Sequence, residues 1–97
     1  MQSTQFYINK LREFKNKYSS EYSIERIGFF GSVARGEQTE NSDIDIYYEG
    51  KPLGLKSLVE LPQKLETFFG TSVDVIRKHN NLPHSFVERI MQDIIYV

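Results

Sequence analysis

The sequence predicts an α/β (α+β) fold, in which a small mixed sheet of three to four strands is flanked by helices. Two observations favour this fold class: strand-like runs alternate along the chain with amphipathic helical segments, and polar, glycine or proline residues separate them. The length of 97 residues fits one domain, so we expect a single domain over residues 1–97. Because three strands make a small sheet, a fourth short strand is possible near one end.

The chain opens with a predicted helix over residues 3–18, which Ser3 or Thr4 can cap. Its apolar side chains recur at i, i+4, i+7 and i+11, at Tyr7, Leu11, Phe14 and Tyr18. Residues 24–30 are rich in β-branched and aromatic residues and predict a strand. The polar residues 37–42 predict a surface loop.

A second strand is predicted over residues 43–49 by strict alternation. One face carries Ile44, Ile46 and Tyr48, and the other carries Asp43, Asp45 and Tyr47. Residues 55–69 predict a helix with a break near Leu61, because Pro62 removes a backbone donor inside the window. The candidate core residues of this helix are Leu55, Leu58, Val59, Leu61, Leu65, Phe68 and Phe69.

The last third of the chain predicts a strand over residues 71–77, interrupted by Asp74, and a helix over residues 84–94. In the helix, apolar residues recur at i, i+4 and i+8, at Phe86, Ile90 and Ile94. The chain ends in the apolar residues 94–97. We expect this segment to add an edge strand to the sheet rather than to dock on a partner, because exposed apolar surface is costly.

Charge and composition exclude several classes of protein. The formal net charge is −1, so we expect no strong direct binding of nucleic acid through bulk positive charge. The absence of cysteine excludes disulfides and thiolate metal sites. No segment approaches about 20 consecutive apolar residues and no signal peptide is apparent, so we expect a cytoplasmic protein without a membrane association.

Three aspartates are the first candidates for a functional site. Aspartate is depleted in strands, yet Asp43 and Asp45 place two repelling carboxylates on one strand face. A divalent cation such as Mg²⁺ turns this repulsion into attraction. If the strands are neighbours, Asp74 adds a third carboxylate, and the three together could hold two metal ions. The alternative is that these aspartates are solvated on an open sheet face.

Gly31 and Ser32 are the second candidates, because they end a predicted strand and open a turn or short helix. Glycine lets the backbone approach a ligand closely, and backbone N–H groups at a helix start favour anions. The following residues match neither a Walker loop nor a nucleophile elbow. The alternative is an ordinary turn. Arg35 follows and could contact phosphate or a partner, or be a solvated surface residue.

Residues 31–46, GSVARGEQTENSDIDI, resemble the Gly-Ser-x10-Asp-x-Asp signature of the DNA polymerase β-like nucleotidyltransferase superfamily. Ala34-Arg35-Gly36 after the Gly-Ser pair agrees with the resemblance. The short chain, without a helical substrate domain, is similar to the stand-alone minimal nucleotidyltransferases, and the resemblance covers essentially the whole chain.

The resemblance implies a role for each motif residue. Gly31 and Ser32 would hold the β- and γ-phosphates of ATP. Asp43 and Asp45 would ligate two Mg²⁺ ions. Asp74 matches the third carboxylate, which ligates the catalytic metal and helps to activate the acceptor hydroxyl.

The resemblance also implies a biological partner. Minimal nucleotidyltransferases act as antitoxins of HEPN-domain RNase toxins and transfer AMP from ATP to a toxin tyrosine. One alternative is an antitoxin that neutralises its toxin mainly by binding. A third possibility is an enzyme that modifies a small-molecule hydroxyl, which ranks last because such enzymes usually carry an additional domain.

Overall fold

A computed structural model describes residues 2–97 of the protein, and these residues form an alternating series of helices and strands. The elements are α1 (Thr4–Tyr18), β1 (Ile24–Phe30), α2 (Gly31–Arg35), β2 (Ile44–Gly50), α3 (Leu55–Phe69), β3 (Val73–Arg77), α4 (His84–Asp93) and β4 (Ile95–Tyr96). The predicted fold class is confirmed, and apart from the expected break in the 55–69 helix the predicted elements differ from the observed ones by only a few residues at their ends.

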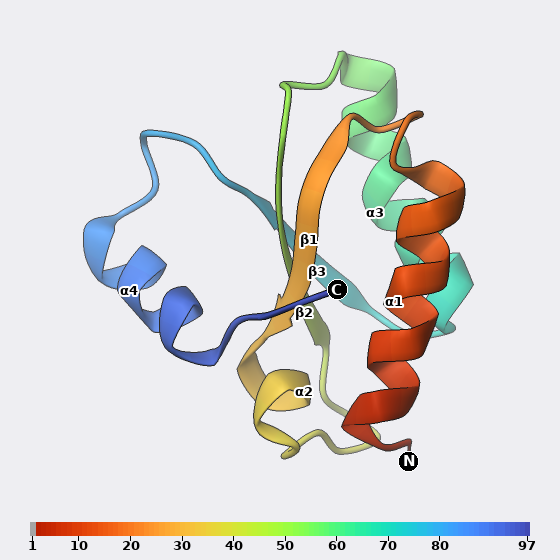
Figure 1. Ribbon diagram of the computed structural model, residues 1–97, viewed down its shortest axis with the longest axis vertical. Coiled ribbons are helices and arrows are strands. Elements are labelled where there is room, and N and C mark those ends of the chain that lie inside the picture. The colour runs from red at the N-terminus through yellow and green to blue at the C-terminus, as the bar shows by residue number, and fades with distance from the viewer. Residues whose placement is uncertain (1) are drawn as a thin grey trace.

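The strands form one mixed sheet in the order β3-β2-β1-β4 (Figure 1). β1 pairs antiparallel with both β2 and β4, whereas β2 pairs parallel with β3. The predicted edge strand at the chain end is confirmed, since Ile95 and Tyr96 pair with β1. The parallel register places Asp45 of β2 opposite Asp74 of β3.

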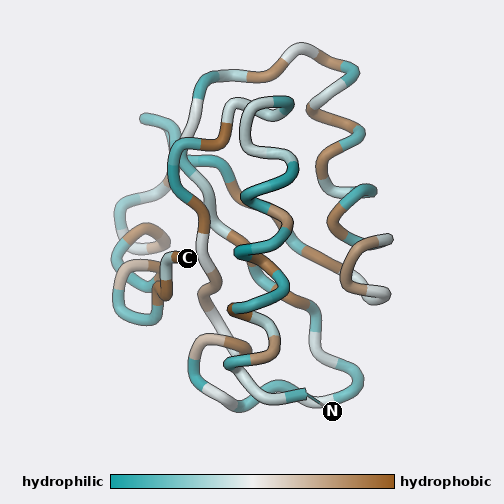
Figure 2. Tube along the Cα trace, turned by 45° about the vertical axis from the view of Figure 1, so that its right-hand side comes forward, coloured by the Kyte–Doolittle hydropathy of each residue, from teal (hydrophilic) through white to brown (hydrophobic). Residues whose placement is uncertain are grey.

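The core lies between one face of the sheet and the helices α1 and α3 (Figure 1). The alternation of β2 turns Ile44, Ile46 and Tyr48 into this core. Hydrophobic and hydrophilic residues are interleaved along the helices, as amphipathic helices require (Figure 2). α4 lies on the opposite side of the sheet (Figure 1), where its Ile90 is 1% exposed.

α1 begins as the sequence predicts. The Ser3 hydroxyl accepts a hydrogen bond from the Phe6 backbone N–H at 3.2 Å and so caps the helix. Leu11 and Phe14 of the predicted stripe are fully buried. α1 is therefore fixed both at its first turn and along its core-facing side.

α3 corrects one prediction. The expected break near Leu61 is wrong, because the helix continues through Pro62 from Leu55 to Phe69. Proline has no backbone N–H, so the carbonyl of the residue four positions earlier receives no hydrogen bond within the helix. That residue is Leu58, which is 52% exposed, so the proline lies in a part of α3 that is open to solvent.

The first turns of α3 correct a second prediction. Leu55, Leu58 and Val59 were predicted to be core residues, but they are 79%, 52% and 52% exposed. Figure 1 shows the first turn of α3 beyond the end of β1, where no strand lies beneath it. Only Leu61 and Leu65 of this helix are fully buried in the core, and Phe68 and Phe69 pack against it.

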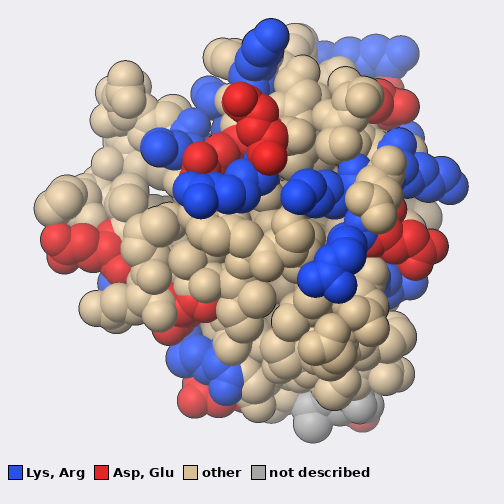
Figure 3. Space-filling model, in the orientation of Figure 1, with Lys and Arg blue, Asp and Glu red and all other residues tan. Residues whose placement is uncertain are grey.

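The surface carries charges of both signs, with acidic and basic side chains interspersed over the visible face (Figure 3). No helix within residues 2–97 has the length and apolar character needed to cross a membrane.

Candidate active site

The site is built around Gly31, where β1 passes directly into α2. The residue has a φ of +72°, in the left-handed region that favours glycine. A Cβ on Gly31 would collide with Oδ2 of Asp45 and would lie 3.1 Å from its Cγ. Glycine therefore serves twice: it permits the turn, and it lets the Asp45 carboxylate lie against the start of α2.

The sheet brings the predicted aspartates to one face. Asp45 and Asp74 are register partners on the neighbouring parallel strands β2 and β3. Asp43 lies one residue before β2 and two before Asp45, close enough for its charge to act on the Asp45 carboxyl. Asp43 and Asp74 are exposed, whereas Asp45 is half-buried.

Burial and like charges both act on the Asp45 carboxyl at this face. Burial raises the pKa of the Asp45 carboxyl above its ordinary value, and the charges of Asp74 and Asp43 raise it further. Arg35 opposes this shift in the pKa. Among residues 2–97, none of the three aspartates forms a salt bridge. The repulsion between them is therefore left largely unrelieved by the protein.

The donor set is that of a hard divalent cation. Carboxylate oxygens are the protein ligands that Mg²⁺ prefers, and Mg²⁺ commonly fills its remaining positions with water and substrate phosphate. Within the described part of the chain, no three His, Cys, Asp or Glu side chains are grouped so as to hold an ion by themselves. The aspartates thus fit Mg²⁺ as partial ligands, on a face that must share the ion with other oxygens.

A cleft of about 480 Å³ opens beside Asp45. One wall comes from β1, α2 and β2 and consists of Phe30, Gly31, Ser32, Arg35 and Asp45. The other wall comes from α4 and consists of Phe86, Arg89, Ile90, Gln92 and Asp93. The structure thus brings together four predicted site residues, while Asp43 and Asp74 lie outside the lining of this cleft.

Arg35 joins the two walls. Its Nε donates to Glu37 Oε1 at 2.8 Å, and its Nη1 donates to Asp93 Oδ2 of α4 at 2.6 Å. The Arg35 side chain is 46% exposed, so these ion pairs add modest stability but fix its direction. Because the guanidinium carries five N–H donors, others remain available to a ligand.

The α4 wall was not predicted as part of the site. Phe86 and Ile90 were interpreted only as an apolar stripe. A signal was nevertheless present, because Arg89 and Asp93 fall at i+3 and i+7 from Phe86 and so share its side of the helix. Charged residues within an otherwise apolar stripe indicate that the helix faces more than a core.

Residues 11–97 match the family model described as nucleotidyltransferase domain. The chain belongs to this family. A Methanocaldococcus jannaschii protein with a provisional protein adenylyltransferase name is 42% identical over 91 residues, covering 90% of each chain. The protein adenylyltransferase MntA of Thermococcus cleftensis is 31% identical over 88 residues, covering 90% of this chain and 88% of its own. The chain is thus a homologue of protein adenylyltransferases.

Solved structures agree with this assignment. A provisionally named minimal nucleotidyltransferase superposes with a TM-score of 0.78 at 26% identity, covering 97% of this chain and 95% of its own. A toxin–antitoxin structure with AMP-PNP superposes with a TM-score of 0.73 at 25% identity, covering 91% of this chain and 69% of its own. In that relative, an ATP analogue accompanies the same fold.

Replacing Asp45 should stabilise the protein at neutral pH. A carboxyl whose pKa is raised by folding favours the folded state at acidic pH, and this contribution is lost as the pH rises through the raised pKa. Urea unfolding of Asp45→Asn at pH 7 should therefore give a larger free energy of unfolding than wild type, with the gain shrinking below about pH 4. Glu25→Gln, which neutralises an exposed carboxylate, is the control and should show no such gain.

Replacing Gly31 should displace Asp45. Gly31→Ala and Gly70→Ala both place a side chain at positive φ, at a cost of about 1–2 kcal/mol each. Only at Gly31 would the new Cβ meet Asp45, because nothing lies within 4 Å of it at Gly70. Carboxyl NMR titration should show the Asp45 pKa moving toward its ordinary value in Gly31→Ala alone. An unchanged pKa in Gly31→Ala would contradict the close approach.

Proposed function

We propose that the protein is a protein adenylyltransferase that transfers AMP from ATP to a hydroxyl group of a partner protein. The observation that carries this proposal is the Asp45–Asp74 pair beside the Gly31-Ser32 turn, on a chain homologous to protein adenylyltransferases. By the resemblance of its motif, the partner is a HEPN-domain toxin, its acceptor is a tyrosine, and the chain is the antitoxin. The relative with AMP-PNP, itself a toxin–antitoxin structure, supports this assignment.

The phosphates of ATP are bound at the start of α2. Backbone N–H groups at the start of α2 are donors for a phosphate, and the Ser32 hydroxyl adds another. Arg35 lines the same cleft and keeps N–H donors beyond those given to Glu37 and Asp93. These three residues together hold the triphosphate beside Asp45.

The three carboxylates would serve as metal ligands. Asp43, Asp45 and Asp74 would bind two Mg²⁺ ions together with phosphate oxygens and water. Bound there, Mg²⁺ supplies neutralisation of the phosphate charge that builds up during transfer. Without a cation, the triphosphate would meet a face where burial and the neighbouring carboxylates already raise the pKa of Asp45.

The reaction needs little beyond positioning and charge. The acceptor oxygen forms a bond to the α-phosphorus while the bond from that phosphorus to the bridging β-phosphate oxygen breaks, and pyrophosphate leaves. The acceptor hydroxyl loses its proton, which Asp74 can accept. Asp74 suits this role because it is exposed and can meet a hydroxyl brought by a large partner, whereas Asp45 is half-buried.

Removing two metal ligands should abolish transfer. Asp43→Asn with Asp45→Asn is expected to slow AMP transfer by more than about 100-fold, because charge stabilisation of the transition state is lost. The readout is the intact mass of the co-expressed toxin, which should gain one or more AMP units only with the wild-type antitoxin. Circular dichroism and thermal unfolding confirm that the variant is folded.

The matched control is Glu13→Gln with Glu25→Gln, which removes two exposed carboxylates elsewhere and should leave transfer unchanged. If the double aspartate variant still labelled the toxin, the proposed roles of these residues would be wrong. A tight complex with the wild-type chain and no change in toxin mass would instead support neutralisation by binding. Labelling of a small molecule with none of the protein would contradict the proposed acceptor.

A further inference from the structure

Two arginines line the cleft, and the structure uses them differently. Arg35 is held by Glu37 and Asp93 at 2.8 and 2.6 Å. Arg89 lies on the opposite wall and is exposed. It forms no salt bridge with any other residue of the range 2–97. The cleft therefore contains one cation engaged by the protein and one that is not.

Four residues of α4 form a stripe that faces the cleft, and one of them lacks a protein partner. Phe86 packs edge-on against Phe30 of β1 with ring centroids 6.4 Å apart, and Ile90 is 1% exposed. Asp93 is paired with Arg35. Arg89 lies at i+3 from Phe86 and four residues before Asp93, so it belongs to the same stripe. Three of these four residues have a structural role, and Arg89 is left as the cationic one; the fifth α4 residue of the lining, Gln92, carries no charge.

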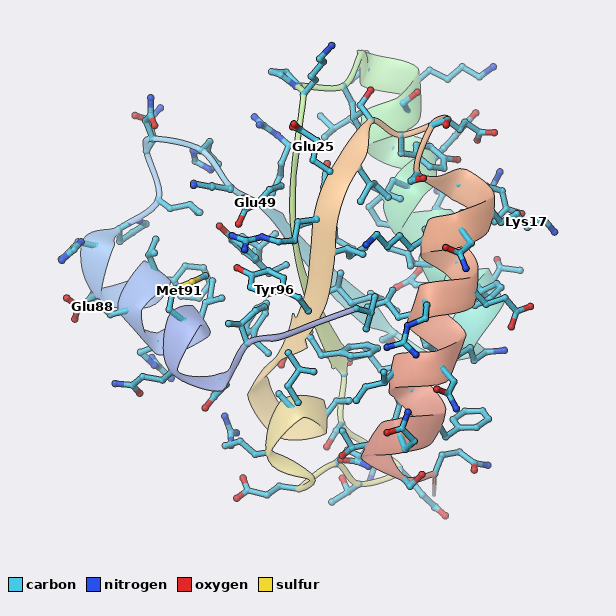
Figure 4. All side chains as sticks on the ribbon, in the orientation of Figure 1. Lys17, Glu25, Glu49, Glu88, Met91 and Tyr96 are labelled. Carbon is cyan, nitrogen blue, oxygen red and sulfur yellow. The ribbon has the colours of Figure 1, made fainter. Side chains whose placement is uncertain are left out.

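The chain after α4 holds this wall in place. β4 follows directly and pairs with β1. The Arg26 guanidinium lies over the Tyr96 ring, 3.9 Å from its centroid. The Tyr96 hydroxyl donates to Glu49 at 3.4 Å and to the sulfur of Met91 of α4 at 3.8 Å. Figure 4 shows Tyr96, Glu49 and Met91 close together on this side of the sheet. Arg89 is thus carried by a helix with fixed contacts at both ends.

We propose that Arg89 is a further nucleotide-binding residue, whose guanidinium binds phosphate oxygens of ATP from the wall opposite Gly31 and Ser32. This inference rests on the proposed function. The cleft walls already carry Asp45 and Asp93, so an uncommitted guanidinium between them would reduce the repulsion that a triphosphate meets there. Arginine suits this task because its planar fork of N–H donors matches the oxygens of a phosphate group.

The test is the affinity of the Mg²⁺ complex of a non-hydrolysable ATP analogue, measured by calorimetry, for wild type, Arg89→Gln and Arg89→Lys. Arg89→Gln should weaken binding roughly 10- to 100-fold, and Arg89→Lys should lose less because the charge remains. In the transfer assay, Arg89→Gln should mainly raise the KM for ATP. Arg12→Gln, on the exposed side of α1, removes the same charge and should leave the affinity unchanged.

Arg89→Gln is expected to remain folded, since the side chain is exposed, and thermal unfolding checks this. Binding of the analogue to Arg89→Gln within twofold of wild type would overturn the inference. An equal loss of affinity in Arg12→Gln would also overturn the inference, because the loss would then follow from the total charge of the protein. If Arg89→Gln binds like wild type while wild type still transfers AMP, only the role of Arg89 fails. If wild type binds no ATP analogue, the proposed function fails with it.

Discussion

Asp45 and Asp74 stand opposite each other on the neighbouring parallel strands β2 and β3, and their mutual repulsion is the constraint on which the site depends. Like charges opposite each other oppose strand pairing, and partial burial of Asp45 increases the cost. No salt bridge within residues 2–97 relieves it. A sheet that tolerates this arrangement must gain its stability elsewhere, and the arrangement becomes favourable once a divalent cation lies between the carboxylates.

The compensating stability comes from the other face of the same strands. Ile44 and Ile46 alternate with the aspartates and are buried under α1 and α3, so one strand carries core on one side and site on the other. Each large apolar side chain that is fully buried stabilises the fold by about 1.5–3 kcal/mol, so this face favours pairing of the strands. Gly31 completes the arrangement by leaving room for the Asp45 carboxylate at the turn from β1 into α2.

Much of this could be predicted from the sequence, because alternation and motif spacing are local properties. The strands around Asp45 and Asp74 followed from their apolar pattern, and the Gly31-Ser32 turn from its place after a strand. The parallel register could not be predicted, because it depends on how the α3 crossover packs. Burial along α3 also failed as a prediction, since the periodicity of Leu55 and Leu58 does not tell where the sheet beneath them ends. The cleft wall on α4 was missed because its position is set by the pairing of β4 with β1, across more than 60 residues of chain.

We expect nucleotide phosphates and metal to meet between the Gly31-Ser32 turn and the aspartates. A crystal structure of the protein with Mg²⁺ and a non-hydrolysable ATP analogue tests it most directly. We expect density for the phosphates against Gly31 and Ser32, and Mg²⁺ held by Asp43, Asp45 and Asp74. An analogue bound away from this cleft, or one in the cleft with the aspartates turned toward solvent and no ion between them, would contradict the account.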